Sequence, residues 1–169
     1  FYHPDRLSAQ LLWFESGEVE YRFSLGEIDP VQVEWLEISM ELSSNAPMYR
    51  ENFKSDIYVG LGETELGVWT SPGDYGARRG RFNPSWWSDT SSQYGLLKTW
   101  RVDNQGCTLD GEPLSSVTLA DLNLGRQDYL ALRIGVHADA AHVGGINLFG
   151  EQFGDFAQGI VVRVGYAKP

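Results

Sequence analysis

The chain has 169 residues, of which 42% are hydrophobic and 13% aromatic, and its formal net charge is −10 at pH 7. So acidic a chain repels phosphate backbones, which disfavours direct binding of nucleic acid. The single cysteine, Cys107, excludes an intrachain disulfide, and no apolar run approaches the roughly 18 residues of a membrane-spanning helix.

The first part of the chain carries alternating apolar and polar runs that predict strands. Residues 8–15 and 18–23 flank the turn dipeptide Ser16-Gly17, which predicts a hairpin. Residues 31–42 show the clearest strand pattern, and its phase shifts by one residue at Leu36. That shift predicts a β-bulge or bend in the strand.

The rest of the chain continues with short strands and turn signals. Residues 56–61 and 65–69 predict a second hairpin, whose second strand leads into a long loop. Asp110-Gly111 is a two-residue turn signal, and residues 118–122 could form one helical turn capped by Thr118. The remaining strands are predicted at residues 95–102, 129–136 and 160–166.

No segment predicts a helix long enough for a crossover between parallel strands, so the sheets should be antiparallel. Eight to ten short strands with regular turns are typical of a sandwich or barrel. We therefore expect residues 1–169 to form a single all-β domain, an antiparallel β-sandwich that is jelly-roll-like.

Residues 68–87 (VWTSPGDYGARRGRFNPSWW) form the most unusual stretch of the chain. The stretch has too much Gly and Pro for a helix interior and too little alternation for a strand. Long loops are usually functional or disordered, and disordered segments are poor in aromatic residues. The sequence therefore predicts an ordered loop that carries a site.

Residues 137–156 (HADAAHVGGINLFGEQFGDF) form a second connection rich in glycine and aromatic residues. Both connections lie between predicted strands, so they could meet at one end or on one face of a sandwich. Together they hold the side chains that a sugar site uses, because a pyranose ring packs on an aromatic face and its hydroxyls need paired polar groups. The predicted ligand-binding residues are Trp69, Asp74, Arg78, Arg79, Trp86, Trp87, His142 and Asn147.

A purely structural role is the main alternative for these residues. The tryptophans could pack in the core and the loops, and the arginines could cover them or pair with carboxylates. The basic string at residues 78–81 is unusual in so acidic a chain. It suits contact with a ligand or an anion as well as it suits internal pairing.

Signals for catalysis are weak. The acidic residues are scattered, so no carboxylate pair for glycoside hydrolysis can be selected, and Cys107 has no histidine near it in sequence. His137 and His142, with Asp139 between them, have a spacing that could hold a metal, although an ordinary polar loop is the more common meaning. We predict no enzymatic activity, no metal and no cofactor.

Four strings taken together resemble the C-terminal domain of a group of bacterial ArsR-like transcriptional regulators. These strings are WTSPGD-x-G-x-RRG (69–80), NP-x-WW (83–87), QYGLLKTW (93–100) and GGINLFG (144–150), and the resemblance covers nearly the whole chain. In those proteins a winged-helix DNA-binding domain precedes a β-rich domain of about this size. The resemblance implies a cytoplasmic domain that senses an effector or forms oligomers, with DNA contacted elsewhere.

No helix–turn–helix pattern lies before Ser8, so the N-terminal DNA-binding domain is expected to be absent from this chain. The favoured hypothesis is a ligand-sensing domain of a transcription regulator, with a sugar or sugar derivative as the small-molecule ligand. Alternatives are a stand-alone carbohydrate-binding module and a dimerisation or interaction domain without a small ligand; a homodimer is left open. A glycan-active enzyme ranks last.

Overall fold

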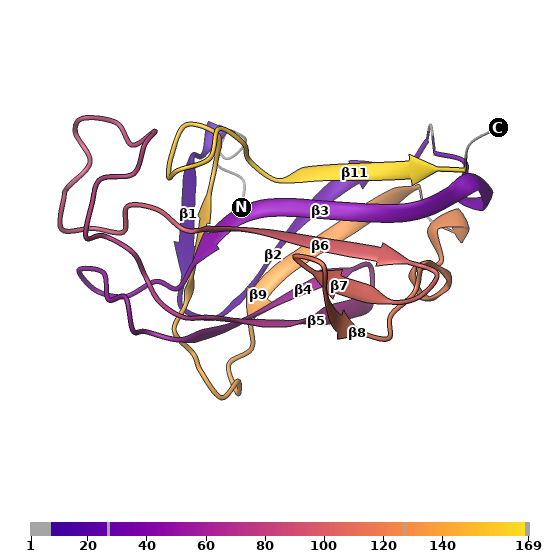
Figure 1. Cartoon of the computed structure of the whole chain (residues 1–169), viewed down its shortest axis with the longest axis horizontal. Helices are drawn as coiled ribbons and strands as arrows, with labels where there is room; N and C mark the ends of the chain where they lie inside the picture. The colour runs from indigo at the N-terminus through magenta and orange to yellow at the C-terminus, as the bar shows by residue number, and fades with distance from the viewer. Residues whose placement is uncertain (1–7, 27, 127, 168–169) are drawn as a thin grey trace.

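The computed structural model describes residues 8–26, 28–126 and 128–167 of the chain. Two antiparallel sheets enclose one hydrophobic core (Figure 1). The chain changes sheet repeatedly between consecutive strands, which gives the sandwich its jelly-roll-like connections. The predicted fold class is confirmed.

In the described part of the chain, the larger sheet has seven strands. Six of them follow the order β1–β10–β3–β6–β7–β8, and β11 pairs with β3 on the same edge as β10. The strands are β1 (Leu11–Phe14), β3 (Val33–Ser43), β6 (Leu96–Asp103), β7 (Cys107–Leu109), β8 (Glu112–Ser115), β10 (Ile146–Phe149) and β11 (Val161–Tyr166).

The smaller sheet has four strands in the order β2–β9–β4–β5, again among the described residues. These are β2 (Gly17–Ser24), β4 (Ser55–Leu61), β5 (Thr64–Ser71) and β9 (Tyr129–Val136). Three short 3-10 helices, η2 (Pro30–Gln32), η3 (Leu119–Leu122) and η4 (Leu124–Arg126), join strands in the described regions. None of the described helices is both long and apolar enough to span a membrane.

Alternation along β3 decides which side chains enter the core. Successive residues of a strand point to opposite faces, so its even-numbered residues share one face. Those residues, Leu36, Ile38, Met40 and Leu42, are at most 1% exposed and pack in one cluster with side chains of β4 and β9. Glu41 and Ser43 point to the outer face, yet both are fully buried. Something must therefore cover the outer face at this end of β3.

The predicted first hairpin is wrong. β1 pairs with β10 in the larger sheet, whereas β2 pairs with β9 in the smaller one. Gly17, with a φ of 99°, lies where the chain passes from one sheet to the other. A tight turn looks the same in sequence whether it joins paired strands or turns a corner between sheets.

The long central strand begins two residues later than predicted. Pro30–Gln32 form η2, which Asp29 caps by accepting a hydrogen bond of 3.1 Å from the Val31 amide. The irregularity in pairing lies between Val33 and Trp35, opposite the Gly165/Tyr166 step, and not at Leu36. The proline and its capping aspartate favour a helical start here.

The sequence also missed β10, a buried four-residue strand inside the connection at residues 137–156. Other predictions are confirmed: β4 and β5 form the second hairpin, and residues 119–122 form a single helical turn. Asp110 and Gly111, with φ values of 52° and 89°, make the predicted turn between β7 and β8. The prediction that no helix–turn–helix precedes Ser8 rests on residues outside the described ranges.

We predict that Ile38→Ala destabilises the protein by about 3–4 kcal/mol, because it opens a cavity between two sheets that share one core. Val31→Ala is the matched control, since Val31 is 92% exposed and should tolerate truncation. Equilibrium unfolding in urea measures both changes. Equal effects of the two substitutions would contradict the placement of Ile38 in the core.

Candidate functional site

Three loops gather beside the outer face of the larger sheet, at the left-hand end of Figure 1. They comprise residues 44–54, 72–95 and 150–160. Backbone hydrogen bonds tie them together: the Phe53 amide donates to the Pro72 carbonyl, and the Phe82 amide to the Gly154 carbonyl, at 3.1 and 2.9 Å. These loops cover the outer face of β3 around Glu41.

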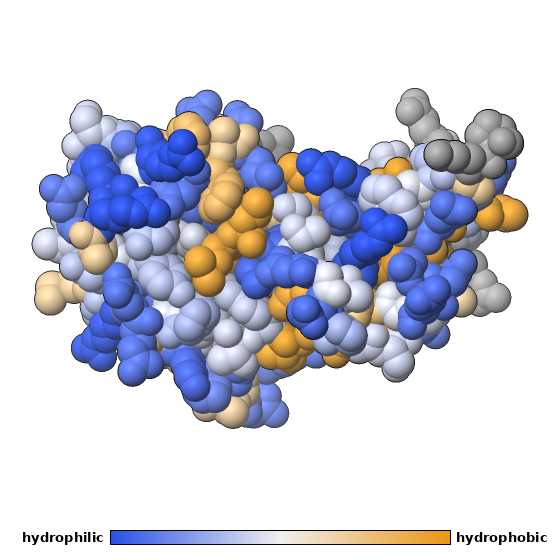
Figure 2. Space-filling view, in the orientation of Figure 1, coloured by the Kyte–Doolittle hydropathy of each residue, from blue (hydrophilic) through white to orange (hydrophobic). Residues whose placement is uncertain are grey.

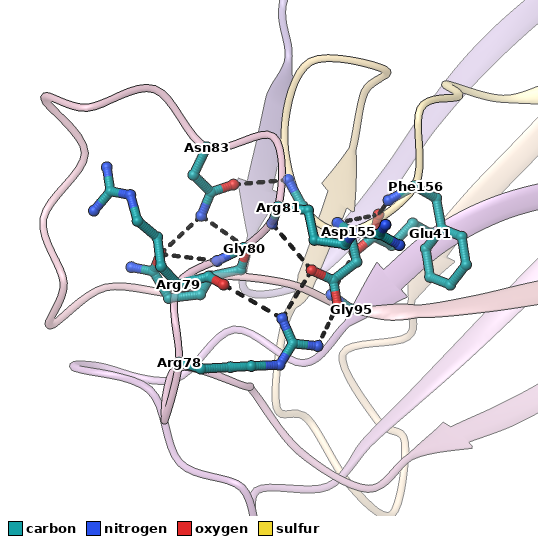
Figure 3. Close-up of polar contacts among 11 residues, drawn as sticks. Glu41, Arg78, Arg79, Gly80, Arg81, Asn83, Gly95, Asp155 and Phe156 are labelled. Atoms are coloured by element: carbon teal, nitrogen blue, oxygen red, sulfur yellow. Dashed lines mark hydrogen bonds and ion pairs between the residues drawn. The ribbon is translucent and has the colours of Figure 1, made fainter.

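Glu41 is the centre of this arrangement. Its carboxylate is fully buried and accepts hydrogen bonds from the amides of Gly95, Asp155 and Phe156 at 2.7, 3.0 and 3.0 Å (Figure 3). Burial raises the pKa of Glu41 above its ordinary value, and the three N–H donors oppose that rise. A Cβ on Gly154, whose φ is +82°, would lie 2.5 Å from a Glu41 oxygen, so glycine is required there.

Arg78 forms an ion pair with Asp155, whose amide donates to Glu41. Its guanidinium makes two hydrogen bonds of 2.9 and 2.5 Å to the Asp155 carboxylate and lies 3.9 Å from the centre of the Tyr94 ring. The Arg81 amide donates to the same carboxylate at 3.1 Å (Figure 3). Burial acts to raise the pKa of Asp155, but the donors and the charge of Arg78 outweigh it, so the pKa lies below its ordinary value.

A second buried carboxylate, Asp74, holds the neighbouring loop. It is fully buried and accepts hydrogen bonds from the Ala46 amide at 2.8 Å and from the Ser92 hydroxyl at 2.7 Å. The side-chain amide of Asn147 donates to Ser92 Oγ at 3.1 Å and to the Ser44 carbonyl at 2.6 Å. Burial raises the pKa of Asp74, and hydrogen bonds to its carboxylate limit the rise.

A groove of about 220 Å³ lies over this second network. Its rim includes the side chains of Trp13 and Met48, which are 57% and 77% exposed. Trp87 is half-buried, donates from Nε1 to the Ser92 carbonyl at 2.8 Å and packs edge-on against Phe153. The lining residues are Leu11, Trp13, Asn45, Ala46, Met48, Trp87, Ser91, Ser92 and Asn147.

Three polar groups of the groove have no hydrogen-bond partner within the described residues. They are the side-chain amide of Asn45, the hydroxyl of Ser91 and the side-chain oxygen of Asn147. The first two belong to half-buried residues, and Asn147 is 2% exposed. The groove thus offers unpaired neutral donors and acceptors beside two indole rings. Such groups can bind a polar, uncharged ligand that also has an apolar face.

The structure brings two of the eight predicted site residues, Trp87 and Asn147, into the groove, and Asp74 lies directly behind it. Trp86 is 76% exposed beside Trp87, with ring centroids 5.8 Å apart, but does not line the groove. Figure 2 shows the surface around these loops as largely hydrophilic, with hydrophobic patches nearer the middle of the molecule.

The other four predicted residues lie outside the groove. Arg78 pairs with Asp155, as described above, and Arg79 bonds to Asp89 at 2.5 Å and to the carbonyl oxygens of residues 84 and 87. Trp69 packs against the core from β5, with the Lys98 ammonium 5.1 Å from the centre of its ring. His142 lies on the smaller sheet's side, 3.1 Å from the Asp56 carboxylate of β4.

Sequence reasoning missed seven of the nine lining residues, among them Trp13, Asn45 and Met48. The sequence pattern predicts a hairpin at Trp13, and only its pairing opposite Asn147 in the structure places it at the groove. Asn45 and Met48 belong to a loop without any aromatic or glycine cluster. The unusual composition of residues 68–87 identified the right loop but not the partners that face it.

In the part of the chain that the structure describes, no three His, Cys, Asp or Glu side chains are grouped so that they could hold a metal ion. The two histidines considered as a metal pair bond to carboxylates instead: His137 lies 3.1 Å from Glu65, and His142 lies 3.1 Å from Asp56. Comparison of the chain with protein-family models, with curated proteins and with solved structures found no significant match.

We predict that Glu41→Ala lowers the free energy of unfolding by about 3 kcal/mol, because two buried amides and one partly buried amide lose their acceptor at ~1–3 kcal/mol each. Limited proteolysis within residues 72–95 should become faster, since the loop loses its anchor. Glu34→Ala, at an exposed position of the same strand, should change neither quantity appreciably. A Glu41→Ala variant as stable and as protease-resistant as the parent would contradict this role.

The Arg78–Asp155 pair should make stability depend on pH in the acid range. Because the folded pKa of Asp155 is lowered, its stabilising contribution is present above pH ~4 and is lost as pH falls through the folded pKa. Arg78→Met should cost about 1 kcal/mol at pH 7, since the arginine is half exposed.

Denaturant unfolding between pH 7 and pH 3 measures the difference between the parent and Arg78→Met, which should shrink as the pH falls. Arg163→Met is the control, because Arg163 pairs with Glu37 at the exposed outer face of β3. A difference for Arg78→Met that stays constant down to pH 3 would show that the pair does not set the Asp155 pKa.

Proposed function

We propose that this chain is a non-catalytic domain that binds a sugar or sugar derivative in the groove between Trp13 and Trp87. In line with the resemblance of its sequence, we propose that it is the effector-sensing C-terminal domain of a cytoplasmic bacterial transcriptional regulator. The observation that carries this proposal is the combination, in one groove, of two tryptophan side chains and three unpaired neutral polar groups.

The tryptophans and the unpaired polar groups each match one part of a sugar. The C–H face of a pyranose packs on an indole, and each buried hydroxyl needs a donor or acceptor to replace water. The amide of Asn45 can donate and accept, the hydroxyl of Ser91 can do the same, and the oxygen of Asn147 can accept. The groove between Trp13 and Trp87 offers both, so the two features support one ligand class.

The groove is also preorganised. Its lining comes from β1, β10 and the loops at residues 44–54 and 72–95, which are far apart in sequence. Asp74 joins these segments through Ala46 and Ser92, and Ser92 accepts a hydrogen bond from Asn147. A site held in place before binding loses less conformational entropy when the ligand arrives.

Our proposal includes no catalytic step. The two carboxylates nearest the groove network, Asp74 and Glu41, are fully buried and accept hydrogen bonds from the protein itself. A general acid or base needs a carboxyl group within reach of the substrate. In the proposed regulator, DNA would be contacted by a separate domain, in keeping with the net charge of −10 of this chain.

One observation favours a second candidate function, a dimerisation or interaction surface. Trp13, Met48 and Trp86 are 57%, 77% and 76% exposed. Large exposed apolar side chains of this kind are enriched at protein interfaces. A stand-alone carbohydrate-binding module would use the same groove as the proposed sensor and would differ only in the domain to which it is attached.

Isothermal titration calorimetry of the isolated chain against mono- and oligosaccharides tests the proposal. We expect at least one sugar to bind, and Trp13→Ala to weaken that binding at least tenfold while leaving the fold intact, because Trp13 lies on an edge strand and is largely exposed. Tyr129→Ala, an exposed aromatic on the smaller sheet, should leave binding unchanged. If no sugar binds and the chain is a dimer that Trp13→Ala dissociates, the interface function is correct instead.

A further inference from the structure

We infer that the groove selects uncharged sugars and rejects acidic sugars and sugar phosphates. This inference rests on the proposed function and specifies the ligand class of the same site. It follows from the charges that surround the groove, which the sequence alone does not locate. By sequence the basic string at residues 78–81 suits anion contact as well as internal pairing, so the position of its side chains bears on the charge of the ligand.

Among the described residues, no charged side chain lines the groove. Two arginines of the basic string are committed to internal carboxylates: Arg78 makes two hydrogen bonds to Asp155, and Arg79 pairs with Asp89. Arg81, the third arginine of the string, does not line the groove. Arg79 also donates to the carbonyl oxygens of Pro84 and Trp87, which fixes its guanidinium within its own loop. An anionic ligand would therefore find no cation among the described lining residues to replace its water.

A negative group lies directly behind the groove floor. The Asp74 carboxylate is bonded to Ala46 and Ser92, and both residues line the groove. Because this carboxylate is fully buried, water does not screen it as it would screen a surface charge. A phosphate or carboxylate in the groove would be repelled by it as well as by the net charge of −10.

The unpaired polar groups complete the case for a neutral ligand. Asn45, Ser91 and Asn147 offer a carboxamide, a hydroxyl and an amide oxygen, none of which carries a full charge. Sugar hydroxyls both donate and accept, so they can pair with all three. The amide oxygen of Asn147 can only accept, and would leave an anionic oxygen without a donor at that position.

The test compares neutral and acidic sugars that share a ring. Methyl glucoside, glucuronic acid and glucose 6-phosphate, with the corresponding galactose and mannose compounds, are titrated calorimetrically at low and at physiological salt. We expect at least one neutral sugar to bind, and its acidic counterparts to bind at least tenfold more weakly. The part of the difference that comes from the net charge of −10 should narrow as salt rises, whereas the part that comes from the buried Asp74 carboxylate should persist.

Two variants connect the selectivity to the groove. Ser91→Lys places a cation at a half-buried lining position and should improve the binding of the acidic sugar relative to the neutral one at least threefold. Asp74→Asn keeps an acceptor for Ala46 and Ser92 but removes the buried charge. It should also improve the binding of the acidic sugar relative to the neutral one. Arg163→Lys, which keeps the charge on the outer face of β11, is the control and should change neither ratio.

The outcomes separate the inference from the proposed function. Acidic sugars that bind as tightly as neutral ones, in a manner that Trp13→Ala abolishes, would leave the sugar-binding function standing and overturn the selectivity. Absence of binding by every sugar would overturn both. Preference for neutral sugars that Ser91→Lys and Asp74→Asn leave untouched would show that the charges around this groove do not cause the preference.

Discussion

The buried carboxylate of Glu41 is the interaction on which the rest of this site depends. It lies on the outward-pointing side of β3, where a sandwich normally meets solvent, and it accepts hydrogen bonds from three backbone amides of two different loops. An unpaired buried charge is costly, so the charge and the loops stabilise one another. Without these donors Glu41 would have to be solvated, and without Glu41 three amides would lose their acceptor.

The same principle divides the polar residues of the loops into two groups. Arg78, Asp155 and Asp74 use their charges to hold the loops on the sheet. The neutral side chains of Asn45 and Ser91 remain unpaired within the described residues and face the groove. In our account the charged groups build the site, and the neutral groups and tryptophans contact the ligand.

The sequence predicted the fold class and most strands because each depends on local alternation and turn residues. It failed where strand pairing is decided over long distances, as at Ser16-Gly17, where a corner between sheets looks like a hairpin turn. For the site, composition identified the loop that contains Trp87, and the resemblance spans the same residues. It could not show that Arg78 pairs with Asp155, 77 positions away, or that Trp13 lies opposite Asn147.

The central claim is that a sugar occupies the groove between Trp13 and Trp87. The most direct measurement is a two-dimensional ¹H–¹⁵N NMR titration of the chain with the sugar that binds best, following side-chain as well as backbone N–H signals. Our account predicts the largest shifts at the indole N–H of Trp13 and Trp87 and the side-chain amides of Asn45 and Asn147. Shifts centred on the smaller sheet, around Trp69 and His142, would contradict it, as would a titration that moves no signal.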